Sequence, residues 1–267
     1  MVEIPDSVMT RSAALATLSW WRDAGVDTLV DDDPRNWLAP PPAAKPPPDV
    51  TDRQASAPAT APPKPPRSSP AAAARTAEID LSGLTSTLAT CETLEALKEA
   101  AAALRPRPIF ADGDPASGVM IIGETAAPDD DRTGRPFSGP AGALLDRMLA
   151  AIGRDRSSTY ISNLMLWRSY GKAAPADIAM GQAILLRHIE LARPRALLLM
   201  GGEAAKALLA TDTGITRLRG NWVDILAGSH PVPALPTFNP AYLLRRPADK
   251  RMAWADLLAL KAKIDAD

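Results

Sequence analysis

The sequence predicts an α/β protein: a three-layer α/β/α domain with a central four-stranded parallel sheet, preceded by a disordered proline-rich N-terminal linker. Two observations carry this prediction. Short apolar runs, typical of buried parallel strands, alternate with longer segments whose apolar residues recur at helical spacing. In addition, 12 of the 27 prolines fall between residues 40 and 70, and so proline-rich a segment cannot build a packed core.

The individual elements follow from these runs in chain order. We expect strands at 119–123, 159–164, 196–201 and 234–238. We expect helices at 93–103, 141–152, 176–191, 203–209 and 248–264. Because crossovers between parallel strands are right-handed, the carboxyl ends of the four strands should meet at one edge of the sheet, where open α/β folds bind their ligands.

The chain divides into three predicted regions. They are a helical segment at 1–38, a linker rich in proline and alanine at 39–77, and the α/β domain at 78–267. Residues 7–30 have the spacing of an amphipathic helix. A spacer is the expected role of the linker, and a proline-rich ligand for another protein is the alternative.

Composition excludes several functional classes. The formal net charge of −1 gives no overall basic field, so any nucleic-acid binding must come from a local basic patch. One cysteine, Cys91, and two histidines, His188 and His230, are too few for a metal site built from cysteines or histidines. No apolar run is long enough to span a membrane, and no signal peptide is recognisable.

Polar and aromatic side chains gather at the predicted strand ends. Glu124 follows the first strand and opens an acidic, glycine-rich loop that contains Phe137. Asn163 lies at the end of the second strand, and the segment 239–246 follows the fourth. A carboxylate, an aromatic ring, an amide that can pair with a base edge and two arginines suit a site for one flat heterocycle. Each residue also has a plainer interpretation as a cap, core residue or solvated charge, so the prediction rests on their order and spacing.

Four segments of the chain follow one another as motifs of a known family do. The first is Gly-Glu-Thr-Ala-Ala at 123–127, with an acidic pair at 130–131 and the segment 134–146, and the second is Tyr-Ile-Ser-Asn at 160–163. The third is Arg-Pro-Arg at 193–195, which leads to Met-Gly at 200–201. The fourth is Leu-Arg-Gly at 218–220, followed by the segment 237–245. Together they resemble the uracil-DNA glycosylase superfamily, most closely its family-4 branch, which carries an iron–sulfur cluster. The resemblance runs from about residue 91 to residue 258.

The resemblance implies a hydrolase that breaks the N-glycosidic bond of uracil in DNA after the base is flipped out, and leaves an abasic site. It implies that Glu124 is catalytic, stabilising the sugar cation or activating water, and that Asn239 donates to uracil O2. It assigns uracil binding to Thr125, Ala126, Phe137 and Asn163. It assigns DNA contacts to Arg135, Tyr242, Leu243, Leu244, Arg245, Arg246 and Lys250.

The same resemblance sets expectations about partners and location. The expected partner is uracil-containing DNA, single- or double-stranded, and other deaminated bases remain open. We expect a monomer in the cytoplasm, associated with the nucleoid, with residues 1–75 available to a repair-protein partner. No membrane partner is expected.

Three departures from the family pattern stand out. Asn239 replaces the family's histidine, and Ala126-Ala127 replaces Pro-Gly. The cluster cysteines are absent, because Cys91 lacks its mate at Leu94 and the two later positions fall at Trp167 and about Gly181. We therefore expect no iron–sulfur cluster and no other cofactor, with Trp167 and apolar packing in its place.

Two other interpretations stay open. One is a catalytically weakened protein of the same fold that binds uracil or abasic sites in DNA. The other is an accessory protein whose N-terminal helix and linker attach it to a repair partner. Retention of Glu124, Phe137 and Asn163 together favours the enzyme.

Overall fold

The structure is a computed structural model that describes residues 81–266 except 170 and 172, and, nearer the N-terminus, only residues 15, 16 and 19. The predicted linker, and nearly all of the predicted N-terminal helix, lie outside the described residues. Within the described part of the chain, no helix is both long enough and apolar enough to cross a membrane.

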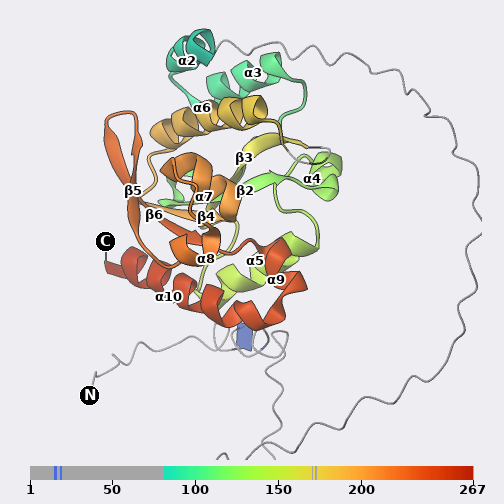
Figure 1. Ribbon diagram of the computed structural model, residues 1–267, viewed down its shortest axis with the longest axis vertical. Coiled ribbons are helices and arrows are strands. Elements are labelled where there is room, and N and C mark those ends of the chain that lie inside the picture. The colour runs from blue at the N-terminus through green and yellow to red at the C-terminus, as the bar shows by residue number, and fades with distance from the viewer. Residues whose placement is uncertain (1–14, 17–18, 20–80, 170, 172, 267) are drawn as a thin grey trace, which may run out of the picture. The chain divides into compact units, whose positions relative to one another are not determined.

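A six-stranded mixed sheet forms the centre of the domain (Figure 1). Its strand order is β1-β3-β2-β4-β6-β5. The strands are β1 (Asp112–Gly113), β2 (Val119–Ala126), β3 (Tyr160–Arg168), β4 (Ala196–Met200), β5 (Val223–Ala227) and β6 (His230–Thr237). The middle four strands are parallel, whereas β1 and β5 pair antiparallel at the two edges.

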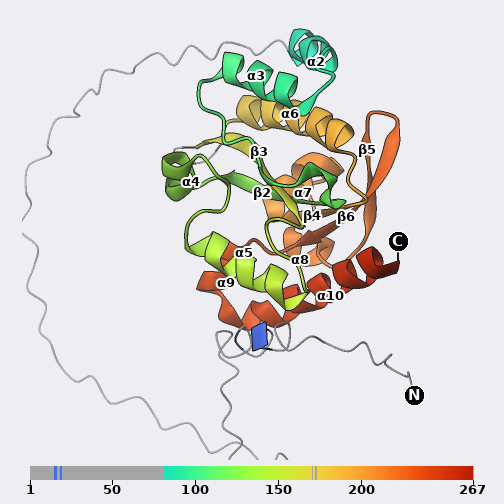
Figure 2. The ribbon, with the colours of Figure 1, turned by 180° about the vertical axis from the view of Figure 1, so that it is seen from behind.

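Helices cover both faces of the sheet, which makes the three layers that the sequence predicts (Figures 1 and 2). They are α2 (Leu81–Ala89), α3 (Leu94–Leu104), α4 (Pro128–Thr133), α5 (Pro140–Ala151), α6 (Pro175–Ala192), α7 (Gly202–Leu209), α8 (Ile215–Leu218), α9 (Pro240–Arg245) and α10 (Lys250–Ala266). Short 3-10 turns lie at Pro115–Ser117 and Pro247–Asp249.

The alternation of side chains along β2 explains the two cores. Val119 and Ile121 face α5 and α10, while Met120 and Ile122 face α6 and α7, and all four are at most 2% exposed. Burial of a strand on both faces is why these residues form an unbroken apolar run. A third core, on the outer side of α6, joins α2 and α3 to the domain.

Two features of the sheet differ from the prediction of four parallel strands. The edge strands β1 and β5 were not predicted, because β1 has only two residues and β5 exposes Val223 and Leu226 instead of burying them. In addition, β2 extends to Ala126, beyond the predicted end at residue 123, with a register shift between Thr125 and Ala126. Glu124 therefore lies in a strand and not in the loop after it.

Strand register brings distant residues together at the carboxyl ends of the parallel strands. Gly123 pairs with Asn163 of β3. On its other side β2 pairs with β4 so that Ile122 lies beside Leu199, which directs Glu124 toward Gly201. Met200 pairs with Thr237 of β6, and Asn239 follows two residues later.

Candidate active site

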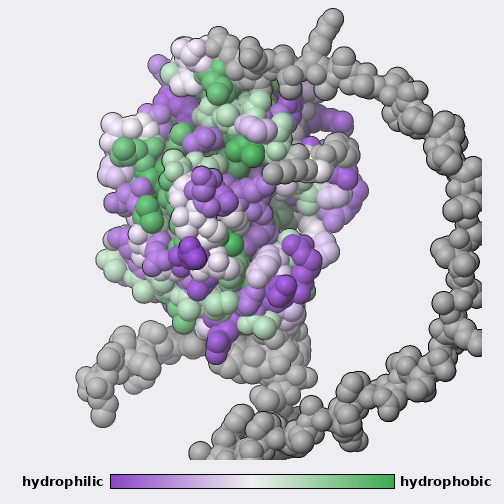
Figure 3. All heavy atoms as spheres, viewed as in Figure 1, coloured by the Kyte–Doolittle hydropathy of each residue, from purple (hydrophilic) through white to green (hydrophobic). Residues whose placement is uncertain are grey.

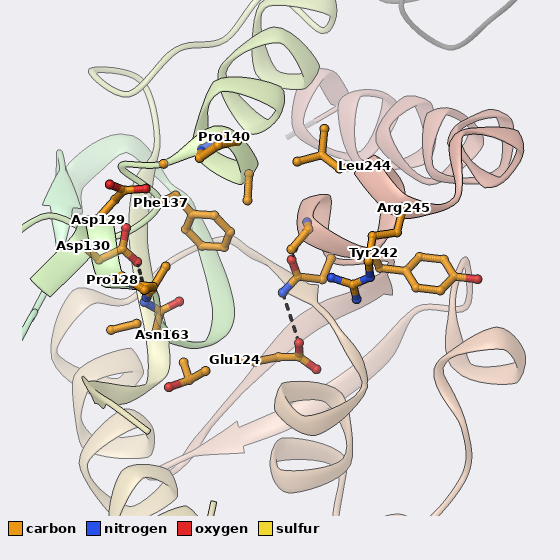
Figure 4. A pocket seen from close by; sticks show the side chains of 18 residues that line it. Glu124, Pro128, Asp129, Asp130, Phe137, Pro140, Asn163, Tyr242, Leu244 and Arg245 are labelled. Carbon is orange, nitrogen blue, oxygen red and sulfur yellow. Dashed lines mark hydrogen bonds between the residues drawn. The ribbon is translucent and has the colours of Figure 1, made fainter. Parts of the chain in front are cut away.

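A cavity of about 660 Å³ opens at this edge of the sheet (Figure 4). Its walls come from the end of β2, from α4 and the loop before α5, from β3 and from α9. Hydrophilic side chains cover the α4 and α9 regions on the right of Figure 3. The cavity is lined by Glu124, Thr125, Ala126, Ala127, Pro128, Asp129, Asp130, Phe137, Gly139, Pro140, Ala141, Gly142, Asn163, Asn239, Ala241, Tyr242, Leu244 and Arg245.

The Glu124 carboxylate lies against the N-terminus of α7. Its Oε1 accepts a hydrogen bond of 2.9 Å from the backbone N–H of Glu203, and the Gly202 amide also donates to the carboxylate. Gly201 makes this approach possible, since a Cβ there would lie 2.3 Å from Cδ of Glu124 and its φ is +119°. Backbone amides at a helix N-terminus are favourable partners for an anion.

Asn239 holds the other carboxylate oxygen. Its Nδ2 donates to Oε2 of Glu124 over 3.1 Å and to the carbonyl of Met200 over 3.4 Å. Its Oδ1 accepts from the N–H of Ala241 and caps α9. Both hydrogens of the amide thus have protein partners, so the geometry differs from the expected donor to a base oxygen.

Burial dominates the electrostatics of Glu124. Desolvation raises the pKa of Glu124 above its ordinary value, and the charge of Glu203 adds to this rise. The hydrogen bonds from Glu203, Asn239 and Gly202 lower the pKa but do not cancel the effect of burial. A carboxyl with a raised pKa in a cavity is a candidate for proton transfer or charge stabilisation.

Phe137 and Asn163 meet over Gly123. A Cβ at Gly123 would lie 2.2 Å from Oδ1 of Asn163 and 2.6 Å from Cζ of Phe137, so only glycine fits between them. Asn163 is 1% exposed, and its Nδ2 has no hydrogen-bond partner among the residues that the structure describes. A buried amide without a partner costs free energy and is available to a ligand in the cavity.

The two other residues predicted to bind uracil lie at the end of β2. Both Thr125 and Ala126 line the cavity. The hydroxyl of Thr125 donates to the carbonyl of Trp167 over 3.3 Å, and Ala126 is 3% exposed.

Five of the seven residues predicted to contact DNA divide into an exposed group and a buried group. Leu244, Arg245 and Arg246 are exposed at the end of α9, and the first two line the cavity. Leu243, by contrast, is 0% exposed in the core beneath α9, and Lys250 is 4% exposed at the start of α10. Both side chains are buried, unlike the three exposed residues of this group.

The remaining two predicted DNA contacts are held by acidic partners. The hydroxyl of Tyr242 donates to Asp249 over 2.6 Å, and its ring stacks on Phe238. The exposed Arg135 forms an ion pair of 2.9 Å with Asp112.

Asp130 belongs to the acidic pair of the first motif but was assigned no role from the sequence, and the structure shows that it closes the loop beside the cavity. Its side chain is buried and accepts from the N–H groups of Ala127 (2.9 Å) and Ser138 (2.6 Å). Three aspartates follow one another at 129–131, and the signal for the middle one is its place as the third residue of α4, where an acidic side chain accepts from the N-cap N–H.

Comparison with known proteins gives the family. Residues 110–258, more than half of the chain, match the family described as the Uracil DNA glycosylase superfamily. The chain belongs to this superfamily. The resemblance inferred from the four motifs is thereby confirmed.

Named relatives agree with this membership. A type-4 uracil-DNA glycosylase of Thermotoga maritima is 31% identical over 166 residues, which cover 60% of this chain and 84% of that protein. One from Archaeoglobus fulgidus is 30% identical, over 51% of this chain and 71% of its own length. One from Pyrobaculum aerophilum is 27% identical, over 64% of this chain and 87% of its own length.

The residues at the family-4 cluster positions do not fit an iron–sulfur cluster in this superfamily member. Cys91, Leu94 and Trp167 belong to the third core, and the Trp167 indole N–H donates to the carbonyl of Arg105 over 3.1 Å. A Cβ at Gly181 would lie 2.4 Å from the carbonyl oxygen of Leu164, so a cysteine cannot replace this glycine without a backbone shift. One thiol among four positions cannot ligate a cluster. The described residues also contain no group of three or more histidine, cysteine, aspartate or glutamate side chains that could hold a metal ion.

The raised pKa of Glu124 predicts how stability depends on pH. The folded protein binds this proton more tightly than the unfolded chain, so wild type loses stability as pH rises from the ordinary value of 4.5 through the folded pKa. The Glu124→Gln variant has no ionisable group at this position. Its free energy of unfolding, relative to that of wild type, should therefore increase across that pH range and then level off. Denaturant unfolding at a series of pH values measures this difference, with exposed Glu99→Gln as control. A difference that does not vary with pH would contradict the burial argument.

Proposed function

We propose that this protein is a uracil-DNA glycosylase, which hydrolyses the bond between uracil and deoxyribose in DNA and leaves an abasic site. The observation that carries the proposal is the unpartnered Nδ2 of Asn163, buried in a cavity beside the Phe137 ring and near Glu124 (Figure 4). Family membership and the names of the relatives support the same activity. We assign it to the predicted domain at 78–267.

Recognition of uracil follows from the chemistry of the cavity walls. The base leaves the stack and enters the cavity, where Phe137 stacks on it. Nδ2 of Asn163 donates to uracil O4, and Oδ1 accepts from N3–H. Cytosine presents an amino group and a bare N3 at the same edge, so it would leave both atoms of the amide wrongly paired.

Glu124 carries the chemistry in this proposal. As the bond between C1′ and N1 breaks, its electron pair goes to the uracil ring and positive charge develops on the sugar. The ionised carboxylate stabilises that charge and accepts a proton from the water that adds to C1′. Asn239 acts through Glu124, because its amide hydrogens already have partners in Glu124 and Met200.

DNA is held at the end of α9 in this proposal. Leu244, which is 41% exposed, lies at the mouth of the cavity and enters the space that the base leaves. Arg245 and Arg246 contact neighbouring phosphates.

A catalytically weakened DNA-binding protein is the second candidate. The observation that favours it is Asn239, since a neutral amide bonded to Glu124 provides no donor to the departing uracil. Turnover distinguishes the two candidates.

The first test is a time course of uracil excision from a single-uracil oligonucleotide, followed by alkali cleavage, with the protein limiting. Wild type should turn over. Glu124→Gln should lower kcat by about 100-fold or more, and Asn163→Ala should lower kcat/KM by about 10- to 100-fold because a buried polar contact is lost.

Glu99→Gln is the control for Glu124→Gln. It makes the same change at an exposed carboxylate of α3, outside the cavity lining, so activity should stay within about threefold of wild type. Uracil-specific binding without turnover would support the second candidate. If the protein neither binds nor cleaves uracil-containing DNA, both candidates are refuted.

The proposed phosphate contact at Arg245 predicts a change in salt dependence. Affinity for a non-cleavable uracil analogue in DNA should fall with salt, and Arg245→Ala should reduce the slope of log K against log salt by about one. Arg107→Ala, an exposed cation outside the cavity lining, should leave the slope unchanged. Equal slopes for wild type and Arg245→Ala would remove Arg245 from the interface.

A further inference from the structure

The backbone of Phe137 adopts a strained conformation that needs stabilising contacts from neighbouring residues. Its φ is +54°, in the left-handed region that a bulky side chain rarely occupies. Such a conformation persists only where its surroundings fix it, and it is typical of functional sites. The ring itself is 8% exposed and packs over Gly123.

Arg156 binds the two carbonyls of this turn. It lies in the connection between α5 and β3. Its Nη2 donates to the carbonyl of Phe137 over 2.5 Å and its Nη1 to that of Pro136 over 3.1 Å. No step of the proposed reaction uses this side chain, and it does not line the cavity.

Two carboxylates fix the guanidinium in place. Nη1 of Arg156 also donates to Asp112 of β1 over 2.7 Å, and Nε donates to Asp146 of α5 over 2.7 Å. Arg135, from the same loop as Phe137, forms a second ion pair with Asp112. Although burial raises the pKa of Asp112, its contacts with Arg135 and Arg156 hold that pKa below its ordinary value. The guanidinium has a rigid fork of donors that suits several acceptors at once.

The opposite side of the turn is equally constrained. A Cβ at Gly142 would lie 1.6 Å from the Phe137 carbonyl oxygen, so glycine is required for that oxygen to point toward Arg156. The next N–H along the chain, that of Ser138, donates to Asp130. Arg156 therefore holds the carbonyl side of the turn, and Asp130 holds its amide side.

We propose that Arg156 is a positioning residue for the reaction: it holds the strained turn at Phe137 so that the ring presents its face to the flipped base. The proposal rests on the proposed function for its catalytic consequence. Without Arg156 the turn relaxes toward ordinary φ values, the ring leaves its position over Gly123, and the base is no longer stacked. A misplacement of about 1 Å is enough to lower a rate by about 100-fold.

The first experiment measures the stability of the turn at Phe137 without any substrate. Hydrogen exchange at residues 137–139 is compared in wild type, Arg156→Gln, Arg156→Lys and Arg154→Gln. Arg154 is the matched control, because it lies in the same connection and donates to the carbonyl of Ser158. Exchange should become faster in both Arg156 variants and stay as in wild type for Arg154→Gln. Unchanged exchange in the Arg156 variants would overturn the proposal.

The second experiment is a double-mutant cycle on uracil excision with Phe137→Leu, which keeps an apolar side chain but lacks the flat ring. Arg156→Gln should lower kcat/KM by about 10- to 100-fold in wild type, but by less than about twofold in the Phe137→Leu background. Equal factors in both backgrounds would overturn the proposal, since Arg156 would then act independently of the ring.

Two controls keep these outcomes separate. If Arg156→Gln does not fold, Arg156→Lys replaces it, because lysine keeps a positive charge beside Asp112 but cannot reproduce the fork. If wild type does not excise uracil, the proposed function fails, while the exchange experiment still decides whether Arg156 holds the turn.

Discussion

Burial of the Glu124 carboxylate beside the N-terminus of α7 is the constraint on which the rest of the site depends. The carboxylate needs a glycine at 201 to approach the helix, backbone amides of α7 to receive it, and Asn239 to bond its second oxygen. Gly201 and the α7 amides directly follow β4, Asn239 follows β6, and the parallel register of β2, β4 and β6 brings both segments to Glu124. The sheet thus sets the position of the charge, and burial sets its pKa.

A second buried charge supports the loop that carries Asn239. Arg219 forms an ion pair with Asp256, which is 1% exposed and also accepts a hydrogen bond from Thr237 over 2.6 Å. The guanidinium lies 5.5 Å from the ring centre of Phe238, the residue before Asn239. Loss of one partner from such a pair leaves an uncompensated buried charge. Arg219 of the Leu-Arg-Gly motif therefore joins α10 to the end of β6 and to the residue before Asn239.

The central strands and most helices could be predicted because burial on both faces leaves a continuous apolar run, as in β4. The edge strand β5 could not, because its exposed Val223 and Leu226 do not follow the core pattern. Sequence alone also could not separate Leu243 from Leu244, since adjacent leucines on a six-residue helix differ only in which face the fold covers. The partners of Asn239 and the anchoring role of Arg156 depend on contacts between distant segments, which no local pattern encodes.

We expect Asn239 to act by holding Glu124 in its ionised form. A direct test is the pH dependence of single-turnover uracil excision for wild type and Asn239→Ala. The rate should rise as Glu124 ionises, and in Asn239→Ala the rise should shift to higher pH, because the hydrogen bond that lowers the pKa of Glu124 is lost. Identical pH midpoints in the two proteins would show that Asn239 does not hold Glu124 in its ionised form.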